Sequence, residues 1–215
     1  MKNIITKVEA QVKNKDRYNV YVNDKYLFSI SSNTYLDKPY LKKGYEISDE
    51  EIEELKKVSG RELAFSYILY QNSFGKRTEK QIRDKFKKQG KYSPSEIEYA
   101  IDKAKSLLII DDDGFCRAYI EMCKNKNYGK RKIISKLVEK GIYKDIYEPI
   151  FEELENGDED DFLESAIERC RKKNNYIKIE DMYKRKGALY RHLAYHGFNS
   201  DIINKAIEIV LEEDS

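Results

Sequence analysis

The sequence predicts a mainly α-helical, elongated protein in which three tandem three-helix repeats follow a small N-terminal β-hairpin segment. Two observations predict this fold. After residue 58 an apolar stripe that ends at a glycine occurs three times, and in the first thirty residues β-branched and aromatic residues alternate with polar ones. The predicted bounds are 1–58 for the N-terminal strands with their linking helix, and 59–112, 113–156 and 157–215 for the three modules.

The N-terminal segment has the pattern of a hairpin. Two β-branched and aromatic runs between Tyr18 and Ile30 are separated at Asn23-Asp24, and these two residue types tolerate the positive φ of a tight turn. Because a single hairpin is marginally stable, we expect this segment to pack on a neighbour. A capping box at Ser48–Glu51, followed by apolar residues at helical spacing, predicts that the linking helix begins there.

The repeat is anchored on Gly90, Gly141 and Gly197. Glycine is the usual left-handed stop just past the last turn of a helix. Apolar residues stand four and eight positions before each glycine, at the spacing of one helix face: Phe86 and Ile82, Leu137 and Ile133, Leu193 and Leu189. Another apolar-periodic segment follows each glycine and a third precedes the stripe, so each copy predicts three helices.

Composition disfavours most enzyme classes. The 215 residues include two histidines and 10 glycines, and they contain no glycine-rich nucleotide-binding motif. His192 and His196 share a helix face, but Leu193 stands where a zinc protease needs its glutamate. Cys116, Cys123 and Cys170 have no metal-ligand spacing and are interpreted as buried apolar residues. We therefore expect no catalytic residue, no metal and no cofactor.

The sequence has no apolar stretch long enough to cross a bilayer, and its first residues do not resemble an export signal. The expected location is the cytoplasm, with no membrane partner.

Charge is strongly segregated although the net charge is only +2. Residues 76–91 carry eight basic and two acidic side chains, residues 124–140 carry seven and one, and residues 169–191 carry nine and two, whereas residues 148–164 carry nine acidic and no basic ones. Five and one positions before the glycines stand Lys85 and Gln89, Lys136 and Lys140, and His192 and His196, which predicts a repeated basic face. Such a face suits a polyanion, with nucleic acid as the first candidate.

Tyrosines lie within or beside the basic segments, among them Tyr128, Tyr176, Tyr190 and Tyr195. They could stack on unpaired bases, or they could be half-buried core residues with a solvated hydroxyl group. The basic faces could likewise be ordinary solvated surface, and the acidic run at Asp158–Asp161 is interpreted as a solvated loop between modules.

Three segments together resemble the RecX family of regulators of the RecA recombinase. They are residues 64–90, the stretch YGKRKIISKLVEKGI at 128–142, and the stretch LYRHLAYHGFNSDI at 189–202. The resemblance covers nearly the whole chain and is least diagnostic over residues 1–57. It implies a non-enzymatic, tandem-repeat protein that binds the RecA filament on single-stranded DNA. Members lie in the filament groove and suppress its ATPase, strand-exchange and coprotease activities.

The resemblance also implies binding residues, partners and a cellular role. The residues that match commonly basic family regions are Lys76, Arg77, Lys80, Arg83 and Lys87 in the first repeat, and Lys130, Arg131, Lys132 and Lys136 in the second. Where the family often has arginine, this chain has Tyr70, Gln71 and Asn72. The expected partners of this monomer are the RecA filament, single-stranded DNA and, weakly, double-stranded DNA. The role belongs to DNA repair, homologous recombination and the SOS response.

One alternative stays open at this point. The chain could be an autonomous nucleic-acid-binding helical-repeat protein without a recombinase partner. Salt titration separates the two hypotheses, since the alternative requires tight, steeply salt-dependent binding to bare nucleic acid.

Overall fold

A computed structural model describes residues 2–213, with the side chains of all of these except residues 154–160. The chain forms two compact units. The first comprises Met1–Lys76 and Ile82–Ile110, and the second comprises Arg77–Gln81 and Asp111–Ser215. Each unit is described by itself.

The first unit opens with a three-stranded antiparallel sheet in the order β1-β2-β3, formed by β1 (Ile5–Ala10), β2 (Arg17–Val22) and β3 (Lys25–Ser31). The predicted hairpin is confirmed, and β1 adds a third strand to it. Asn23 and Asp24 make the β2–β3 turn with φ of 50° and 65°, the left-handed conformation that their short polar side chains tolerate.

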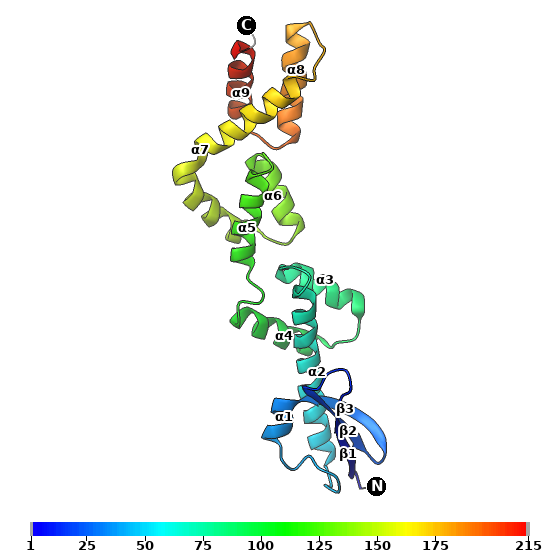
Figure 1. Ribbon diagram of the computed structural model, residues 1–215. Helices are drawn as coiled ribbons and strands as arrows, with labels where there is room; N and C mark the ends of the chain where they lie inside the picture. Colours follow the sequence, from blue (N-terminus) through cyan, green and yellow to red (C-terminus); the bar gives the residue numbers. More distant parts are fainter. Residues whose placement is uncertain (1, 214–215) are drawn as a thin grey trace. The chain divides into compact units, whose positions relative to one another are not determined.

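The sheet packs on a long helix, as expected for so small a β element. After the short helix α1 (Ser32–Asp37), α2 (Asp49–Asn72) begins at the predicted Ser48–Glu51 capping box. Its first turns place Ile52 and Leu55 against Val20, Phe28 and Ile30 of the sheet, and all five are buried. Figure 1 shows α2 continuing from the sheet toward α4 within this unit.

A second core of the first unit forms around the other half of α2. Ala64 and Ile68 of α2 pack with Ile82 and Phe86 of α3 (Glu79–Gln89) and with Ile101 of α4 (Pro94–Ser106). The helix α2 therefore serves two cores without interruption. The predicted boundary at residues 58 and 59 lies inside this helix, and the module bounds stay a prediction.

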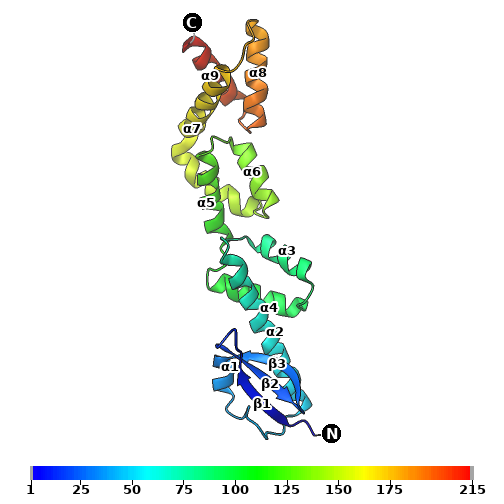
Figure 2. The same ribbon diagram turned by 45° about the vertical axis from the view of Figure 1, so that its right-hand side comes forward.

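The second unit also has two cores, joined by one long helix. The first core lies between α5 (Asp112–Lys124), α6 (Lys130–Glu139) and the first half of α7 (Lys144–Asn174). The second lies between the other half of α7, α8 (Met182–Tyr195) and α9 (Ser200–Glu213). Figures 1 and 2 both show α8 beside α9.

The prediction of a loop at Asp158–Asp161 is wrong, because α7 is helical throughout its 31 residues. Charge alone does not end a helix, because glutamate and aspartate are tolerated in its interior. An acidic stretch can therefore continue the helix that both cores share. The side chains of residues 158–160 lie outside the described residues.

The three glycine stops are confirmed. Gly90, Gly141 and Gly197 have φ of 64°, 89° and 91°. The six apolar residues four and eight positions before them are all at most 2% exposed. The three cysteines are buried as well, and burial raises the pKa of the Cys116 and Cys170 thiols to about 11.

Candidate nucleic-acid interface

The basic residues predicted in the first repeat differ in their surroundings. Lys76 and Lys87 are exposed and form no ion pair with any residue that the structure describes. Arg83, by contrast, makes a two-pronged ion pair with Glu98 of α4, with nitrogen–oxygen distances of 2.6 and 2.8 Å. The hydrogen bond from Arg83 lowers the pKa of Glu98. Arg83 therefore serves the packing of α3 on α4.

Arg77, just before α3, and Lys80, in its first turn, belong to the second unit. The Nζ atom of Lys80 donates to the carbonyl of Glu139 at 3.2 Å. A β-carbon at Gly141 would come within 2.3 Å of the Lys80 Cβ, so the lysine stem lies against this turn. Since the predicted residues of the first repeat are divided between the two units, they do not form one described surface.

The second-repeat lysines lie on α6 and are interleaved with aromatic rings. Lys132 and Lys136 of α6 and Lys140 at its C-cap are spaced four residues apart on one face, which we call the α6 lysine face. Their Nζ atoms lie 4.6, 5.6 and 4.9 Å from the centres of the Tyr195, Tyr128 and Tyr119 rings. These cation–π contacts hold the lysine stems in place while leaving the charges half exposed. Lys140 was not among the predicted binding residues.

The other two predicted residues of this group lie at the start of α6. The Nζ atom of Lys130 lies 5.0 Å from the centre of the Phe151 ring. Arg131 is exposed and its backbone amide donates to the carbonyl of Gly197 at 3.1 Å. The structure thus places Lys130, Lys132 and Lys136 against aromatic rings. The exposed side chain of Arg131 makes no such contact with the described residues.

Arg169 of α7 connects the residues next to the α6 lysine face. It donates to the carbonyls of Lys126 and Asn127 at 2.6 and 2.8 Å, and its guanidinium carbon lies 5.6 Å from the centre of the Tyr128 ring. Its third partner is Nε2 of His196 at 2.9 Å. Because arginine stays protonated, this Nε2 accepts the hydrogen bond and the proton of the neutral ring is on Nδ1. Nδ1 is buried and finds no partner among the described residues.

Both histidines are held in the neutral form. Burial, followed by the charges of Arg169, His192 and Lys132, lowers the pKa of His196 to about 4. Burial, followed by the charges of Lys173 and Arg169, also lowers the pKa of His192. The expected basic positions of the third copy therefore carry no charge at neutral pH, and the positive charge comes instead from α7.

A pocket of about 550 Å³ opens beside Arg169, between the α5–α6 connection, α7 and α8. We call it the basic pocket. Four cations line it, Lys126, Arg169, Lys172 and Lys173, and no carboxylate is among the described residues of its wall. Lys172 is paired with Glu168 at 2.5 Å, whereas Lys126 and Lys173 make no ion pair in the described part of the chain. Such a pocket attracts anions.

Aromatic rings also line the basic pocket. Tyr176 is 83% exposed, and Tyr128 is half buried and reaches both the pocket and Lys136. Tyr128 thus connects the basic pocket with the α6 lysine face. Cations next to an exposed ring such as Tyr176 are the elements with which proteins hold single-stranded nucleic acid.

The basic pocket was not predicted, although the sequence contains a sign of it. The run of nine basic residues from 169 to 191 marks the region, but only the fold separates the α7 cations that meet Lys126 from those on α8. Among the residues whose side chains are described, no cluster of three His, Cys, Asp or Glu residues could hold a metal ion.

The position of α6 is fixed by a contact between two glycines. The amide of Gly129, just before α6, donates to the carbonyl of His196 at 2.9 Å. A β-carbon at Gly129 would come within 2.3 Å of the Gly197 carbonyl carbon, and one at Gly197 within 2.3 Å of the Lys132 nitrogen. We call this contact the Gly129–Gly197 joint. It keeps the start of the α6 lysine face against the α8–α9 turn.

Comparison with known proteins assigns the chain to a family. Residues 3–48 match the domain described as regulatory protein RecX N-terminal domain, and residues 159–207 match RecX, third three-helix domain. A protein named regulatory protein RecX from Clostridium beijerinckii is 34% identical over 98% of this chain and 97% of its own length. The chain belongs to the RecX family.

Other relatives and solved structures agree. A regulatory protein RecX from Clostridioides difficile is 31% identical over 98% of this chain and 97% of its own length. The crystal structure titled regulatory protein RecX covers 98% of this chain and 99% of its own, with a TM-score of 0.77 at 24% identity. That of RecX from Lactobacillus salivarius covers 70% and 96%, with a TM-score of 0.63 at 22% identity. These two structures share the RecX fold.

The family assignment confirms the resemblance seen in the sequence. It also extends to the N-terminal strands, the least diagnostic part of the sequence, which lie within a RecX domain. The third RecX domain includes Arg169, Lys172 and Lys173 of the basic pocket. Relatives are named regulatory proteins, in keeping with a chain for which no catalytic residue was predicted. In residues 2–213, no helix combines the length and the apolar character needed to cross a bilayer.

Proposed function

We propose that this RecX-family protein binds the RecA filament formed on single-stranded DNA and inhibits its ATPase and recombinase activities. One observation carries the proposal: Tyr128 connects the α6 lysine face with the basic pocket, so that cations and aromatic rings form one continuous surface in the second unit. The choice of the RecA filament as the partner rests on membership of the RecX family.

This surface suits the DNA in a filament. Regularly spaced cations neutralise phosphates and release counterions, and tyrosine rings stack on bases of any sequence. The α6 lysine face supplies spaced charges held by cation–π contacts, and the basic pocket supplies a recessed anion site. Neither feature contains a group arranged for chemistry, so the role is one of binding.

Binding at several points accounts for inhibition. A protein with repeated modules can touch several RecA protomers, and weak contacts then gain from a high effective concentration. The described carboxylates of the acidic stretch, such as Glu148 and Glu152, would meet basic surfaces of the filament. A bound protein of this kind restrains the conformational cycle of the protomers and so slows ATP turnover.

Fluorescence anisotropy with labelled protein tests the partner. We expect tight binding to RecA-coated single-stranded DNA, held in a non-hydrolysing state, and weaker binding to the same bare oligonucleotide at each salt concentration. The autonomous binder stays the second candidate because the basic pocket would serve it equally well. Equal affinity for bare and coated DNA would favour that candidate.

A further inference from the structure

A notch on the outer side of α8 is not used by the proposed surface. Gly187 lies in the interior of this helix, where glycine is less favourable than alanine because it loses more backbone freedom. Among the described residues, no close contact requires a glycine here. Its φ is not positive, and a β-carbon there would meet only a guanidinium nitrogen of Arg191 at 3.5 Å, an ordinary contact.

The glycine forms part of the wall of a second pocket, of about 780 Å³, between α8 and α9. Tyr183 precedes it by one turn and Tyr190 follows it by nearly one turn, so both rings flank the missing side chain on the same helix face. Tyr183 is 88% exposed and Tyr190 is 39% exposed, whereas Ile207 of α9, also in the wall, is 6% exposed. The pocket is therefore a notch with two tyrosines on its α8 wall and the buried Ile207 on its α9 wall.

Positive charge surrounds this notch. Lys184, Lys186 and Arg191 line it, against one carboxylate, Glu208. Lys184 approaches Asp181 at 3.9 Å, and Lys186 and Arg191 form no ion pair with any described residue. An apolar peptide side chain would need the rings but not the cations. A nucleotide needs both, because its base stacks and its phosphate carries a negative charge.

We propose that the notch over Gly187 receives one unstacked base of single-stranded nucleic acid, between the rings of Tyr183 and Tyr190. The planar guanidinium of Arg191, which now lies over Gly187, stacks on the base or pairs with its phosphate. A methyl group on residue 187 would take up part of the space between the two rings and hinder the approach of the base. The inference rests on the proposed function, because that function brings single-stranded DNA to the protein. It adds the place at which one base is held.

The full-length protein with Gly187→Ala separates this role from a structural one. Because alanine favours the helix, we expect the variant to melt about 2 °C higher than the wild type. We also expect it to bind oligo-dT at least about fivefold more weakly, since one stacked base is lost. Affinity for an abasic oligonucleotide of the same length and charge should not change. Ser165→Ala, which raises helix propensity on α7, is the matched control and should leave both affinities unchanged.

Two results would overturn the inference. One is an unchanged affinity of Gly187→Ala for oligo-dT, and the other is an equal loss for oligo-dT and the abasic chain. If the first result comes with a loss of RecA inhibition, the notch is a peptide site. Tyr183→Leu keeps the apolar bulk without the ring and should reproduce the loss of base preference. If Gly187→Ala loses the base preference but the wild type does not inhibit RecA, the notch stands and the proposed function fails.

Discussion

Gly129 and Gly197 meet backbone to backbone, and a β-carbon on Gly129 would lie 2.3 Å from the Gly197 carbonyl carbon. Gly197 also has φ of 91°, whereas Gly129 has φ of −74°, which any residue adopts. The two positions therefore share the close backbone contact, but only Gly197 has the left-handed φ that strains other residues. Gly90 has a positive φ but open space around it. Substitution of the three glycines can thus separate the two effects.

We expect Gly197→Ala to destabilise the protein by about 3 kcal/mol, as the sum of left-handed strain and backbone overlap. Gly90→Ala should cost about 1 kcal/mol, because only the strain applies. Gly129→Ala, which introduces overlap without strain, should fall between them. Urea unfolding monitored by circular dichroism measures all three. Similar costs for Gly197→Ala and Gly90→Ala would show that the joint contributes nothing.

An ion pair between Arg17 of β2 and Glu62 of α2 connects the sheet with this helix. Glu62 of α2 lies 3.3 Å from the guanidinium of Arg17, whose side chain is 7% exposed, and it accepts hydrogen bonds from the amide and hydroxyl of Ser31. We expect Glu62→Ala to destabilise the protein by about 3 kcal/mol, because it leaves the Arg17 charge buried without its partner.

The control for this prediction is the exposed pair of Lys2 and Glu46. Glu46→Gln should change the free energy of unfolding by less than about 0.5 kcal/mol. The double variant Arg17→Met with Glu62→Ala should be less destabilised than the sum of the single variants. A Glu62→Ala variant as stable as Glu46→Gln would show that the pair does not hold the sheet.

The lowered pKa of His196 predicts a pH dependence of stability. The folded pKa is about 4 and the ordinary value is 6.5, so between these values the unfolded chain binds more protons. The stability contribution is fully present above pH 6.5 and falls as the pH drops to about 4, by on the order of 1 kcal/mol after allowance for solvent screening.

Denaturation of the wild type and of His196→Gln over this range measures the effect. The difference in stability between the two proteins should shrink as the pH falls. His192→Gln should change the slope in the same direction, since the pKa of His192 is lowered as well. A constant difference between pH 7 and pH 4 would mean that His196 is not held neutral by Arg169 and burial.

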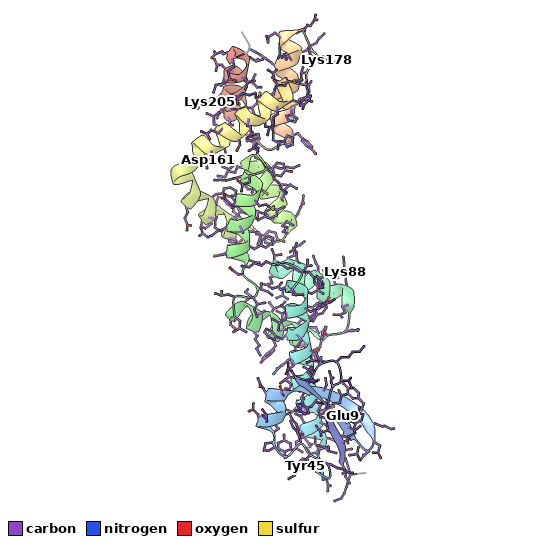
Figure 3. All side chains as sticks on the ribbon, in the orientation of Figure 1. Glu9, Tyr45, Lys88, Asp161, Lys178 and Lys205 are labelled. Atoms are coloured by element: carbon purple, nitrogen blue, oxygen red, sulfur yellow. The ribbon has the colours of Figure 1, made fainter. Side chains whose placement is uncertain are left out.

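The basic pocket predicts part of the salt dependence of DNA binding. Replacing Lys126 and Lys173 with glutamine removes two cations that are unpaired in the described part of the chain. The slope of log affinity for single-stranded DNA against log salt should become shallower by about 1.4, at roughly 0.7 per phosphate contact. Lys178→Gln with Lys205→Gln removes the same charge outside the pocket, at positions labelled in Figure 3, and should leave the slope nearly unchanged. Equal slopes for the two double variants would exclude the pocket as the DNA contact.

The fold could be predicted largely because its signals are local. The capping box at Ser48 and the glycines that end helices act within one turn, and the structure confirms them. The continuity of α7 could not be predicted, because its acidic stretch resembles a loop in composition and only packing on two cores reveals the helix.

The candidate site was harder to predict, because side-chain partners come from distant segments. The charge of Arg83 is paired with Glu98, fifteen residues away, and the stem of Lys80 lies on Gly141. Reversing the charges of Lys80, Arg83 and Lys87 would therefore disturb packing together with binding. The contact of Arg169 with Lys126, 43 residues earlier, created a pocket that no spacing pattern indicated.

ATP hydrolysis by RecA on single-stranded DNA tests the central claim most directly. Saturating wild-type protein should inhibit the reaction, the Lys126→Gln, Lys173→Gln variant should inhibit it less, and the Lys178→Gln, Lys205→Gln variant should inhibit it like the wild type. Circular dichroism should show the same fold for all three. Undiminished ATP hydrolysis with saturating wild-type protein would contradict the account.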